Sequence, residues 1–355
     1  MSIADLVRPN IIALEPYHSA REKVQEGVLL DANENPYTRE WEGIRLNRYP
    51  DPYQRVLRTA IAGYTNVPME SILAGAGSDE VLDWIFKVFC RPGRDRVATA
   101  EPTYGMYRVM AEVFGVGVFE FPLNGEFKID ADQFLRSVPS DVKVLFLCSP
   151  NNPTGNLLDA QEVLKLCREW GKIVVLDEAY VEFAGGESLA DQVRSHPNLI
   201  IMRTLSKAFG RAALRLGYAI ADPEVIGYFM KVKAPYNLGS VVQKEGQLAL
   251  NDLTERDRQV REIQAERGRL EGELKQAPEI NRVFPSQANF LLFRCAGARE
   301  VYEELFRKGI VVRDRSNVPE LEDCIRVSVG TPAENDLFLQ ELRHILKERG
   351  SKSLR

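Results

Sequence analysis

The chain has 355 residues and a mass of 40.1 kDa, which suits two domains or one large domain with a smaller companion. Its 45% hydrophobic and 27% charged residues exclude a disordered, collagen-like or coiled-coil chain. The 46 Lys and Arg residues face 51 Asp and Glu residues, so the formal net charge is −5. This mildly acidic balance lacks the basic footprint of a nucleic-acid-binding protein, and we expect no nucleic-acid partner.

The sequence also indicates a compartment. Five cysteines are scattered without a C-x-x-C pair or zinc-ligand spacing, and an odd number in a chain of this length favours a reducing compartment. The N-terminal stretch contains Asp5, Arg8 and Pro9 and so lacks the apolar core of a signal peptide. No apolar run reaches the ~18 residues that a membrane span needs. The three histidines show no metal-ligand spacing. We therefore expect a cytoplasmic protein with no membrane partner and no metal site.

Helical and strand patterns alternate in the first two thirds of the chain. The run Val81–Phe89 predicts a helix, and residues 158–170 predict another that ends before Gly171. Four short apolar runs are typical of strands buried on both faces, as in parallel sheets. They are Val144–Cys148, Ile173–Leu176, Leu199–Met202 and Gly217–Ile220. We predict a large α/β domain over residues 31–250, with a mainly parallel sheet flanked by helices.

The C-terminal part of the chain has a different pattern. Residues 251–276 are rich in charge and helical in period, which predicts a long surface helix connecting two domains. Strands follow at Asn289–Phe293 and Ile325–Val329, and helices at Ala298–Lys308 and about 333–349. We expect residues 277–355 to form a small α+β domain together with residues 1–30.

The most informative motif is TLSKAFG at residues 204–210, directly after a predicted strand. Its Lys207 stands near the end of that strand, where α/β sheets place their ligands. Thr204, Ser206 and the nearby Arg215 supply hydroxyl and guanidinium groups that suit a phosphate. Taken alone, the motif is more typical of a basic helix start with solvated charges.

Three further motifs end predicted strands or begin a predicted helix. The motif DEAY places the carboxylate of Asp177 and the phenol of Tyr180 after a buried strand, although Asp177 also suits a helix cap. The motif SPNNPTG predicts a rigid turn that directs the amide of Asn152 toward the same edge. The motif GAGSDE at residues 75–80 begins a helix at a glycine-rich turn, which is a potential anion site.

Together these motifs supply an amine, an acid, a phenol, an amide and a phosphate cradle, the groups that a pyridoxal phosphate site requires. The acid keeps the pyridine nitrogen protonated, and the phenol and amide bind the ring oxygen. The lysine binds the cofactor covalently and later moves a proton, so its amine must be neutral for part of the reaction. Burial beside cationic groups favours that neutral form. The combination predicts a pyridoxal-phosphate enzyme.

Over nearly its whole length the chain resembles the fold-type I pyridoxal-phosphate-dependent aminotransferases, class II subfamily. Within them it is similar to the histidinol-phosphate aminotransferases. The motifs that carry this resemblance are LDANENP, RYPDP, GAGSDE, PTYGMY, SPNNPTG, DEAY, TLSKAFG, ANF and IRVSVGT. The resemblance implies transfer of an amino group between histidinol phosphate and 2-oxoglutarate, giving imidazole acetol phosphate and glutamate, in histidine biosynthesis.

The same resemblance implies a role for individual residues. The catalytic residues would be Lys207, Asp177 and Tyr180. Those expected to bind the cofactor are Lys207, Ser78, Asp79, Tyr104, Asn152, Asp177, Tyr180, Thr204, Ser206, Arg215 and Tyr49. Those expected to bind the substrate are Tyr17, Asn33, Arg313 and Arg326. Because Tyr49 reaches the neighbouring subunit's cofactor in the family, the resemblance also implies a homodimer with a shared active site.

Some questions stay open in the sequence. After the lysine the family usually carries a small or apolar residue and a glycine, where this chain has Arg211 and Ala213. Arg211 would either strengthen the phosphate site or point to solvent. An aromatic amino-acid aminotransferase and a threonine-phosphate decarboxylase-like enzyme are alternative functions, because they share the same residues around the cofactor ring. A binding protein that keeps the fold without turnover is a third alternative, which the intact set of cofactor residues disfavours.

Overall fold

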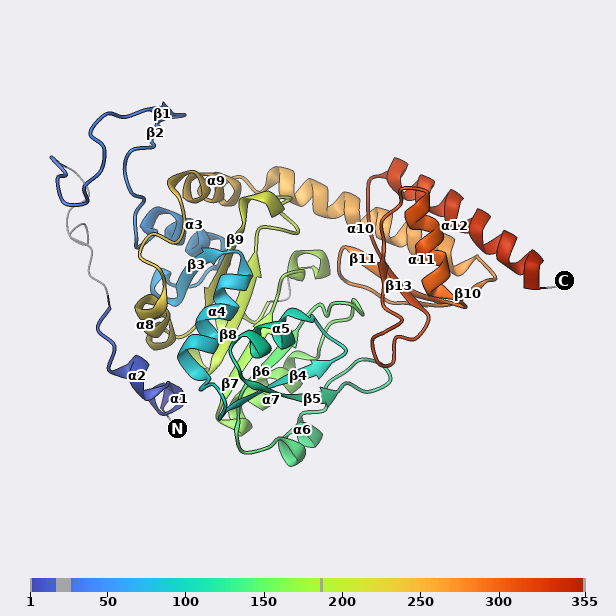
Figure 1. Ribbon diagram of the computed structural model, residues 1–355, viewed down its shortest axis with the longest axis horizontal. Helices are drawn as coiled ribbons and strands as arrows, with labels where there is room; N and C mark the ends of the chain where they lie inside the picture. Colours follow the sequence, from blue (N-terminus) through green and yellow to red (C-terminus); the bar gives the residue numbers. More distant parts are fainter. Residues whose placement is uncertain (1, 17–26, 186–187, 354–355) are drawn as a thin grey trace.

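The computed structural model describes residues 2–16, 27–185 and 188–353. Within them a seven-stranded sheet has the order β3-β9-β8-β7-β6-β4-β5 and forms the centre of the large domain (Figure 1). Its strands are β3 (Ile72–Ala76), β4 (Arg96–Glu101), β5 (Gly117–Pro122), β6 (Val142–Cys148), β7 (Ile173–Asp177), β8 (Leu199–Thr204) and β9 (Leu216–Ile220).

The four strands predicted from apolar runs are confirmed as β6, β7, β8 and β9, and the sheet is mainly parallel, as expected. Strand β9 runs antiparallel to both of its neighbours, β8 and β3, whereas the other adjacent pairs are parallel. The physical reason is the short connection over residues 205–215. A parallel neighbour needs a crossover of a dozen or more residues, usually a helix. The apolar run predicts burial but carries no information on direction.

Helices cover both faces of this sheet, in agreement with the predicted architecture. One face packs against α3 (Arg55–Thr65), α6 (Ala131–Ser137) and α7 (Ala160–Trp170), and the other against α4 (Ser78–Phe89), α5 (Met106–Val113) and α8 (Pro223–Val232). Successive side chains of a strand point to opposite faces. Leu145 and Leu147 of β6 therefore enter the first apolar cluster, and Phe146 enters the second.

The N-terminal segment packs differently from our expectation. We expected residues 1–30 to join the small domain, but their described helices, α1 (Ile3–Leu6) and α2 (Pro9–Ile12), lie on the large domain (Figure 1). Ile3 and Ile11 belong to the apolar cluster formed by α4 and α8. The Lys231 amine of α8 donates a hydrogen bond to the Ile12 carbonyl at 2.9 Å. Short apolar helices without a periodic pattern reveal no packing partner in the sequence.

Helix α10 (Thr254–Lys275) lies within the connecting helix expected over residues 251–276 and leads from α9 (Ser240–Asn251) to the small domain. The small domain contains an antiparallel sheet of order β10-β11-β13-β12 that is packed against α11 (Ala298–Arg307) and α12 (Pro332–Ser353). Its strands are β10 (Ile280–Phe284), β11 (Phe290–Cys295), β12 (Arg313–Asp314) and β13 (Cys324–Ser328).

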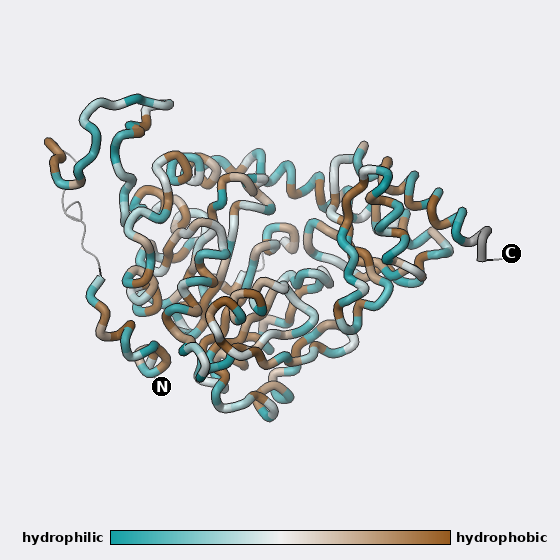
Figure 2. The backbone as a smooth tube through the Cα atoms, viewed as in Figure 1, coloured by the Kyte–Doolittle hydropathy of each residue, from teal (hydrophilic) through white to brown (hydrophobic). Residues whose placement is uncertain are grey.

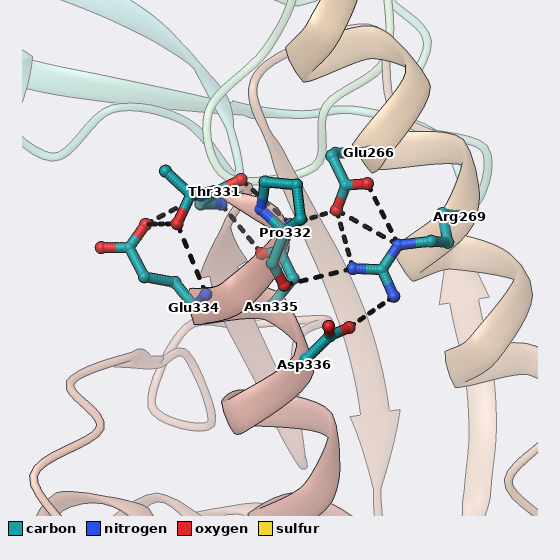
Figure 3. A network of polar contacts seen from close by, with 8 residues as sticks. Glu266, Arg269, Thr331, Pro332, Glu334, Asn335 and Asp336 are labelled. Atoms are coloured by element: carbon teal, nitrogen blue, oxygen red, sulfur yellow. Dashed lines mark hydrogen bonds and ion pairs between the residues drawn. The ribbon is translucent and has the colours of Figure 1, made fainter.

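A polar network joins the start of α12 to α10 (Figure 3). Arg269 of α10 donates to the Asp336 carboxylate at 2.7 Å and forms an ion pair with Glu266 on its own helix. The Asn335 amide also donates to Glu266, at 2.9 Å. These contacts fix the position at which α12 leaves the strand that carries Arg326, so they hold the small domain against the connecting helix.

An arm between the N-terminal helices and α3 stands away from the rest of the chain (Figure 1). It includes the short antiparallel pair β1 (Glu40–Trp41) and β2 (Ile44–Arg45). Figure 2 shows hydrophobic stretches in this arm. Two of its apolar side chains are largely exposed, Val28 (88%) and Leu30 (87%). An extended segment that exposes large apolar side chains calls for a partner surface. Separately, none of the described helices combines the length and apolarity that crossing a bilayer requires.

Candidate active site

A cavity of about 290 Å³ lies where the carboxyl ends of β6, β7 and β8 meet the small domain. The carboxyl ends of parallel strands are where α/β sheets place ligands. The structure brings every predicted cofactor residue except Tyr49 to this cavity. Its lining includes Ser78, Asp79, Tyr104, Asn152, Asp177, Tyr180, Thr204, Ser206, Lys207 and Arg215, together with Arg313 and Arg326 from the small domain.

One end of the cavity is built to accept an anion. Helix α4 begins at Ser78, so its N-terminal amides and the positive end of its dipole face this region. Arg215 binds the Asp79 carboxylate at 3.1 Å, and its guanidinium lies 3.4 Å from the Ser206 hydroxyl. A Cβ on Gly77, which has a positive φ of 79°, would lie 2.6 Å from the Arg215 guanidinium. The backbone conformation at Gly77 therefore favours glycine, and a side chain there would also displace the arginine from its present position.

A second glycine keeps the same end compact. A Cβ on Gly217 of β9 would lie 2.3 Å from the backbone nitrogen of Ser78. Because backbone atoms cannot move aside as a flexible side chain can, only glycine lets β9 pass beneath the start of α4. The Thr204 hydroxyl lies beside it and donates to the Ser206 hydroxyl at 2.9 Å. Together, the hydroxyls, the helix start and the arginine form a compact phosphate cradle.

Asp177 is buried at the end of β7, with an exposed fraction of 4%. Its carboxylate accepts hydrogen bonds from the Tyr107 hydroxyl at 2.8 Å and from the Ala179 amide at 3.1 Å. Burial raises the pKa of Asp177 to about 6, although these two bonds and the charge of Lys207 favour the ionised form. A carboxylate that is costly to ionise in isolation gains from a cationic partner, and a pyridinium nitrogen is such a partner.

Lys207 follows β8 in the loop that leads to β9. Its side chain is open to the cavity, and its amine lies 5.6 Å from the centre of the Tyr180 ring. Burial of the amine end is the main cause that lowers its pKa, and the charges of Arg326 and Arg215 add to the effect. The attraction of Asp177 works in the opposite direction. The site thus favours the neutral amine that covalent and proton-transfer chemistry needs.

Tyr180 and Asn152 meet at the opposite wall of the cavity. The Asn152 amide donates to the Tyr180 hydroxyl at 3.4 Å, and its carbonyl oxygen accepts from Arg326 at 2.5 Å. Phe290 of β11 packs edge-on against Tyr180 and lies under the Arg326 guanidinium, at 5.2 Å in each case. These contacts connect the large domain to the small one through the residues predicted to bind the ring and the substrate.

A buried ion pair braces the two strands that carry Asp177 and Thr204. Arg203 of β8 donates to the Glu178 carboxylate at 2.9 Å, and both side chains are at least nine-tenths buried. The Ser188 hydroxyl and the Leu189 amide donate to the same carboxylate. A buried carboxylate needs this number of donors to offset its desolvation. The pair fixes the separation of the strand ends and therefore the positions of Asp177 and Thr204 at the cavity.

Three expected or uncertain residues lie outside the cavity, and a fourth falls outside the described residues. Tyr49 is half exposed and stacks on Tyr236 with 4.5 Å between ring centres, outside the cavity. Asn33 is exposed on the arm, with a positive φ of 53°. Tyr17 lies outside the described residues. Arg211 is exposed and does not line the cavity. Hydrogen bonds from Arg258 and Gln259 lower the pKa of Glu255 on α10, and the charge of Arg211 makes a smaller contribution.

For two residues at or beside the cavity, the sequence predicted no role. Tyr107 belongs to the motif PTYGMY, but its role as the hydroxyl donor to Asp177 was not predicted. The spacing of three residues between Tyr104 and Tyr107 could have indicated this role, because residues three apart at the start of a helix lie on one face. Arg315 also lines the cavity, and no role was predicted for it.

Comparison with known proteins identifies the family. The sequence pattern of aminotransferase class I and II matches residues 17–342. The chain belongs to this family. A histidinol-phosphate aminotransferase from Parabacteroides distasonis is 45% identical to it over 345 residues, which are 97% of this chain and 99% of that protein.

Solved structures agree with the fold. The histidinol-phosphate aminotransferase from Sinorhizobium meliloti, in complex with pyridoxal-5'-phosphate, has a TM-score of 0.79 and 26% identity, covering 85% of this chain and 83% of that one. An L-threonine-O-3-phosphate decarboxylase from Porphyromonas gingivalis has a TM-score of 0.73 and 25% identity, covering 84% and 91%. The family fold is therefore the fold-type I architecture, and decarboxylases share it.

The cavity fits the cofactor on its own geometry. Its cradle combines a helix start, hydroxyls and Arg215 in a space that Gly77 keeps open, which suits a phosphate. Asp177, with its raised pKa, supplies the buried partner for a ring nitrogen, and Lys207 supplies an amine with a lowered pKa. An amine, an acid and a phosphate cradle around one cavity are the groups that pyridoxal phosphate requires.

Proposed function

We propose that this chain is a pyridoxal-phosphate-dependent histidinol-phosphate aminotransferase that exchanges an amino group between histidinol phosphate and 2-oxoglutarate in histidine biosynthesis. The observation that carries the proposal is the pairing of Arg313 with Arg326 on adjacent strands, at the same cavity as Lys207 and Asp177. A simple amino acid needs one cation for its carboxylate, whereas a phosphate dianion suits two.

In this proposal the cofactor residues divide the work by position. The cradle at the start of α4 binds the cofactor phosphate through the side chains of Ser78, Thr204, Ser206 and Arg215, with Asp79 orienting the arginine. When bound, pyridoxal phosphate supplies a ring that accepts the electron pair released at the substrate carbon.

The remaining residues act on protons and on orientation. Asp177 holds a proton at the pyridine nitrogen, and Tyr107 keeps its carboxylate in place. Tyr180 and Asn152 would bind the ring oxygen, and Tyr104 would pack against the ring. Lys207 would hold the cofactor covalently until the substrate amine takes its place. The neutral Lys207 amine released in this exchange would then take the proton from the substrate carbon that bears the amino group.

The substrate anion lies at the small-domain side of the cavity. Arg313 and Arg326 bind the phosphate of histidinol phosphate, because a planar guanidinium binds two oxygens at once. Arg326 alone receives a carboxylate of 2-oxoglutarate in the other half-reaction. Tyr17 and Asn33 complete the substrate contacts in this proposal.

Replacement of Arg313 by alanine tests this division. A hydrogen bond to a charged group is worth about 1.5–3 kcal/mol, so kcat/KM for histidinol phosphate should fall about 10- to 100-fold. The fall for 2-oxoglutarate should be smaller, because Arg326 still binds its carboxylate. Single-turnover measurement of both half-reactions gives the two values. Equal effects on both substrates would favour the aromatic aminotransferase instead.

Product analysis tests the activity itself. The loaded enzyme is mixed with histidinol phosphate and 2-oxoglutarate, and the products are identified by mass spectrometry. An aminotransferase gives imidazole acetol phosphate and glutamate. A threonine-phosphate decarboxylase-like enzyme instead releases carbon dioxide from threonine phosphate, and a pure binding protein gives no product from either substrate.

We also propose that the enzyme is a homodimer with a shared active site. The arm carries exposed Val28, Leu30 and Tyr37, of which the last is 86% exposed, and it is held in shape by an ion pair of 2.6 Å between Arg48 and Glu34. An ordered, apolar and extended segment suits burial on a second copy. Tyr49, at the end of the arm, would then reach the partner's cofactor.

A mixing experiment tests the shared site. The Tyr49→Ala and Lys207→Ala variants should each lose most activity as homodimers. In an equal mixture that exchanges subunits, half of the dimers are hybrids with one intact site, so activity should recover to about a quarter of wild type. A mixture that stays inactive after exchange has been verified by mass spectrometry would contradict the shared site.

We further place the enzyme in the cytoplasm. All five cysteines are buried as free thiols, and none is paired in a disulfide. Reduced thiols in this number suit a reducing compartment.

A further inference from the structure

We propose that Arg315 is a third cationic ligand of the substrate's anionic group and that it makes the site selective for a phosphate dianion over a carboxylate. This inference rests on the proposed function, since it names how the same site chooses its substrate.

Strand geometry places three guanidiniums on one face. Arg313 lies directly opposite Arg326 in the β12–β13 pair, so the two side chains share a face. Arg315 follows two residues after Arg313, and its amide donates to the Cys324 carbonyl at 2.8 Å, which continues the pairing. Because the side-chain period of a strand is two, Arg315 points to the same face as Arg313. All three arginines line the cavity.

The carboxylate between them does not neutralise this face. Asp314 is the intervening residue, so its side chain points to the opposite face, and its carboxylate accepts a hydrogen bond from the Ser316 amide at 2.8 Å. Among the described residues no carboxylate forms a salt bridge with Arg313, Arg315 or Arg326. Like charges placed opposite each other destabilise a strand pair. Within the described part of the chain, the fold therefore keeps a cluster of three guanidiniums with no salt-bridged carboxylate, and an anion would stabilise it.

Arg315 itself is poorly satisfied without a ligand. It is half-buried, and its Nε has no hydrogen-bond partner among the described residues. Burial, followed by the charges of Arg326 and Arg313, lowers the pKa of its guanidinium to about 10, while Asp314 and Tyr180 counteract this. The side chain remains a cation at neutral pH and has an unpaired buried donor beside the cavity that it lines together with Arg313 and Arg326.

The cavities place this side chain on the way to the reacting groups. Arg315, Tyr104 and Asn152 line both the active-site cavity and an adjoining cavity of about 450 Å³. A substrate that spans the two spaces thus meets Arg315 at their junction. A carboxylate has two oxygens and one charge, which Arg326 can satisfy alone. A phosphate monoester has three terminal oxygens and close to two charges at neutral pH, so it can use a third guanidinium.

The test compares two substrates that differ in their anion. Histidinol phosphate and L-histidine share the imidazole and the amine, but one carries a phosphate and the other a carboxylate. In the loaded Arg315→Gln enzyme, KM for histidinol phosphate should rise about 10- to 100-fold with kcat little changed, while kcat/KM for histidine changes less than about 3-fold. Arg307→Gln is the matched control, because it removes one exposed charge from the same domain and should change neither.

A binding measurement removes the dependence on turnover. Inorganic phosphate should raise the melting temperature of the loaded wild-type enzyme, since a ligand that binds only the folded state stabilises it. The shift should be at least halved in Arg315→Gln and retained in Arg307→Gln. A structural role would instead lower kcat for both substrates and change the absorption of the bound cofactor.

The outcomes separate this inference from the proposed function. Suppose that the wild type turns over histidinol phosphate normally and that Arg315→Gln has the same ratio of kcat/KM for histidinol phosphate to kcat/KM for histidine as the wild type. This result overturns the inference and leaves the proposed function standing. Failure of the wild type to use histidinol phosphate overturns the proposed function. A phosphate-dependent shift that disappears in Arg315→Gln would then still support the anion site.

Discussion

Replacement of Lys207 by alanine should abolish transamination while leaving the protein folded. The amine is expected to bind the cofactor covalently and to move the proton of the substrate, so no other group in the cavity replaces it. General acid–base catalysis alone contributes about 10²–10⁴-fold, and the loss of the covalent attachment adds to this. We therefore expect turnover to fall by at least about 10⁴-fold.

The cradle should still bind some cofactor in this variant, because Arg215 and the start of α4 are unchanged. Absorption spectra of the purified variant should show cofactor without the band of the covalent form. In the wild type, borohydride reduction followed by peptide mapping should label Lys207. Lys233 is an internal comparison, because burial also lowers the pKa of its amine, to about 8, at a position outside the cavity. A label on Lys233 would contradict the assignment.

The sequence predicted the parts of the fold that depend on local pattern. The apolar runs that became β6, β7 and β8 are buried on both faces, and such runs carry their own signal. The long charged helix α10 likewise follows from its composition. Strand β3, with the sequence ILAGA, was not predicted, because small residues give no clear period and its burial comes from neighbouring strands. The local sequence pattern thus predicts which segments are buried better than it predicts how the strands are ordered.

In the site as well, local motifs predicted some residues, whereas contacts between distant segments were not predicted. Lys207 and Asp177 could be found from motifs, because their chemistry requires particular residues after strand ends. The contact from Tyr107 to Asp177 joins residues 70 positions apart, so it depends on packing between β7 and α5. The cluster that includes Arg315 depends on the register of β12 against β13. Neither a contact of this range nor a register can be obtained from residue spacing alone.

The Asp177→Asn variant should separate catalysis from stability. If Asp177 holds a proton at the pyridine nitrogen, the amide cannot replace its charge, and proton abstraction from the substrate should slow by about 10²–10⁴-fold. Folding should be preserved, since an asparagine can still accept from the Ala179 amide and donate to the Tyr107 hydroxyl. If Asp177 were only a helix cap, asparagine would cap equally well and turnover would be near wild type.

In the cofactor-free protein the same substitution should increase stability, because burial raises the pKa of Asp177 to about 6 from its ordinary value of 3.8. Between these values the folded chain binds more protons than the unfolded chain, so the free energy of unfolding of the wild type falls as pH rises from about 4 to about 6. A shift of this size corresponds to a loss of about 3 kcal/mol. Asp177→Asn lacks this loss, so at pH 7 the cofactor-free variant should be more stable than the cofactor-free wild type by about that amount, and at pH 4 the two should be equal. Urea unfolding of both proteins at pH 4 and pH 7 measures the difference. A wild type whose stability relative to the variant does not change between these pH values would show that Asp177 ionises without cost, and the reason for pairing it with a pyridinium would be lost.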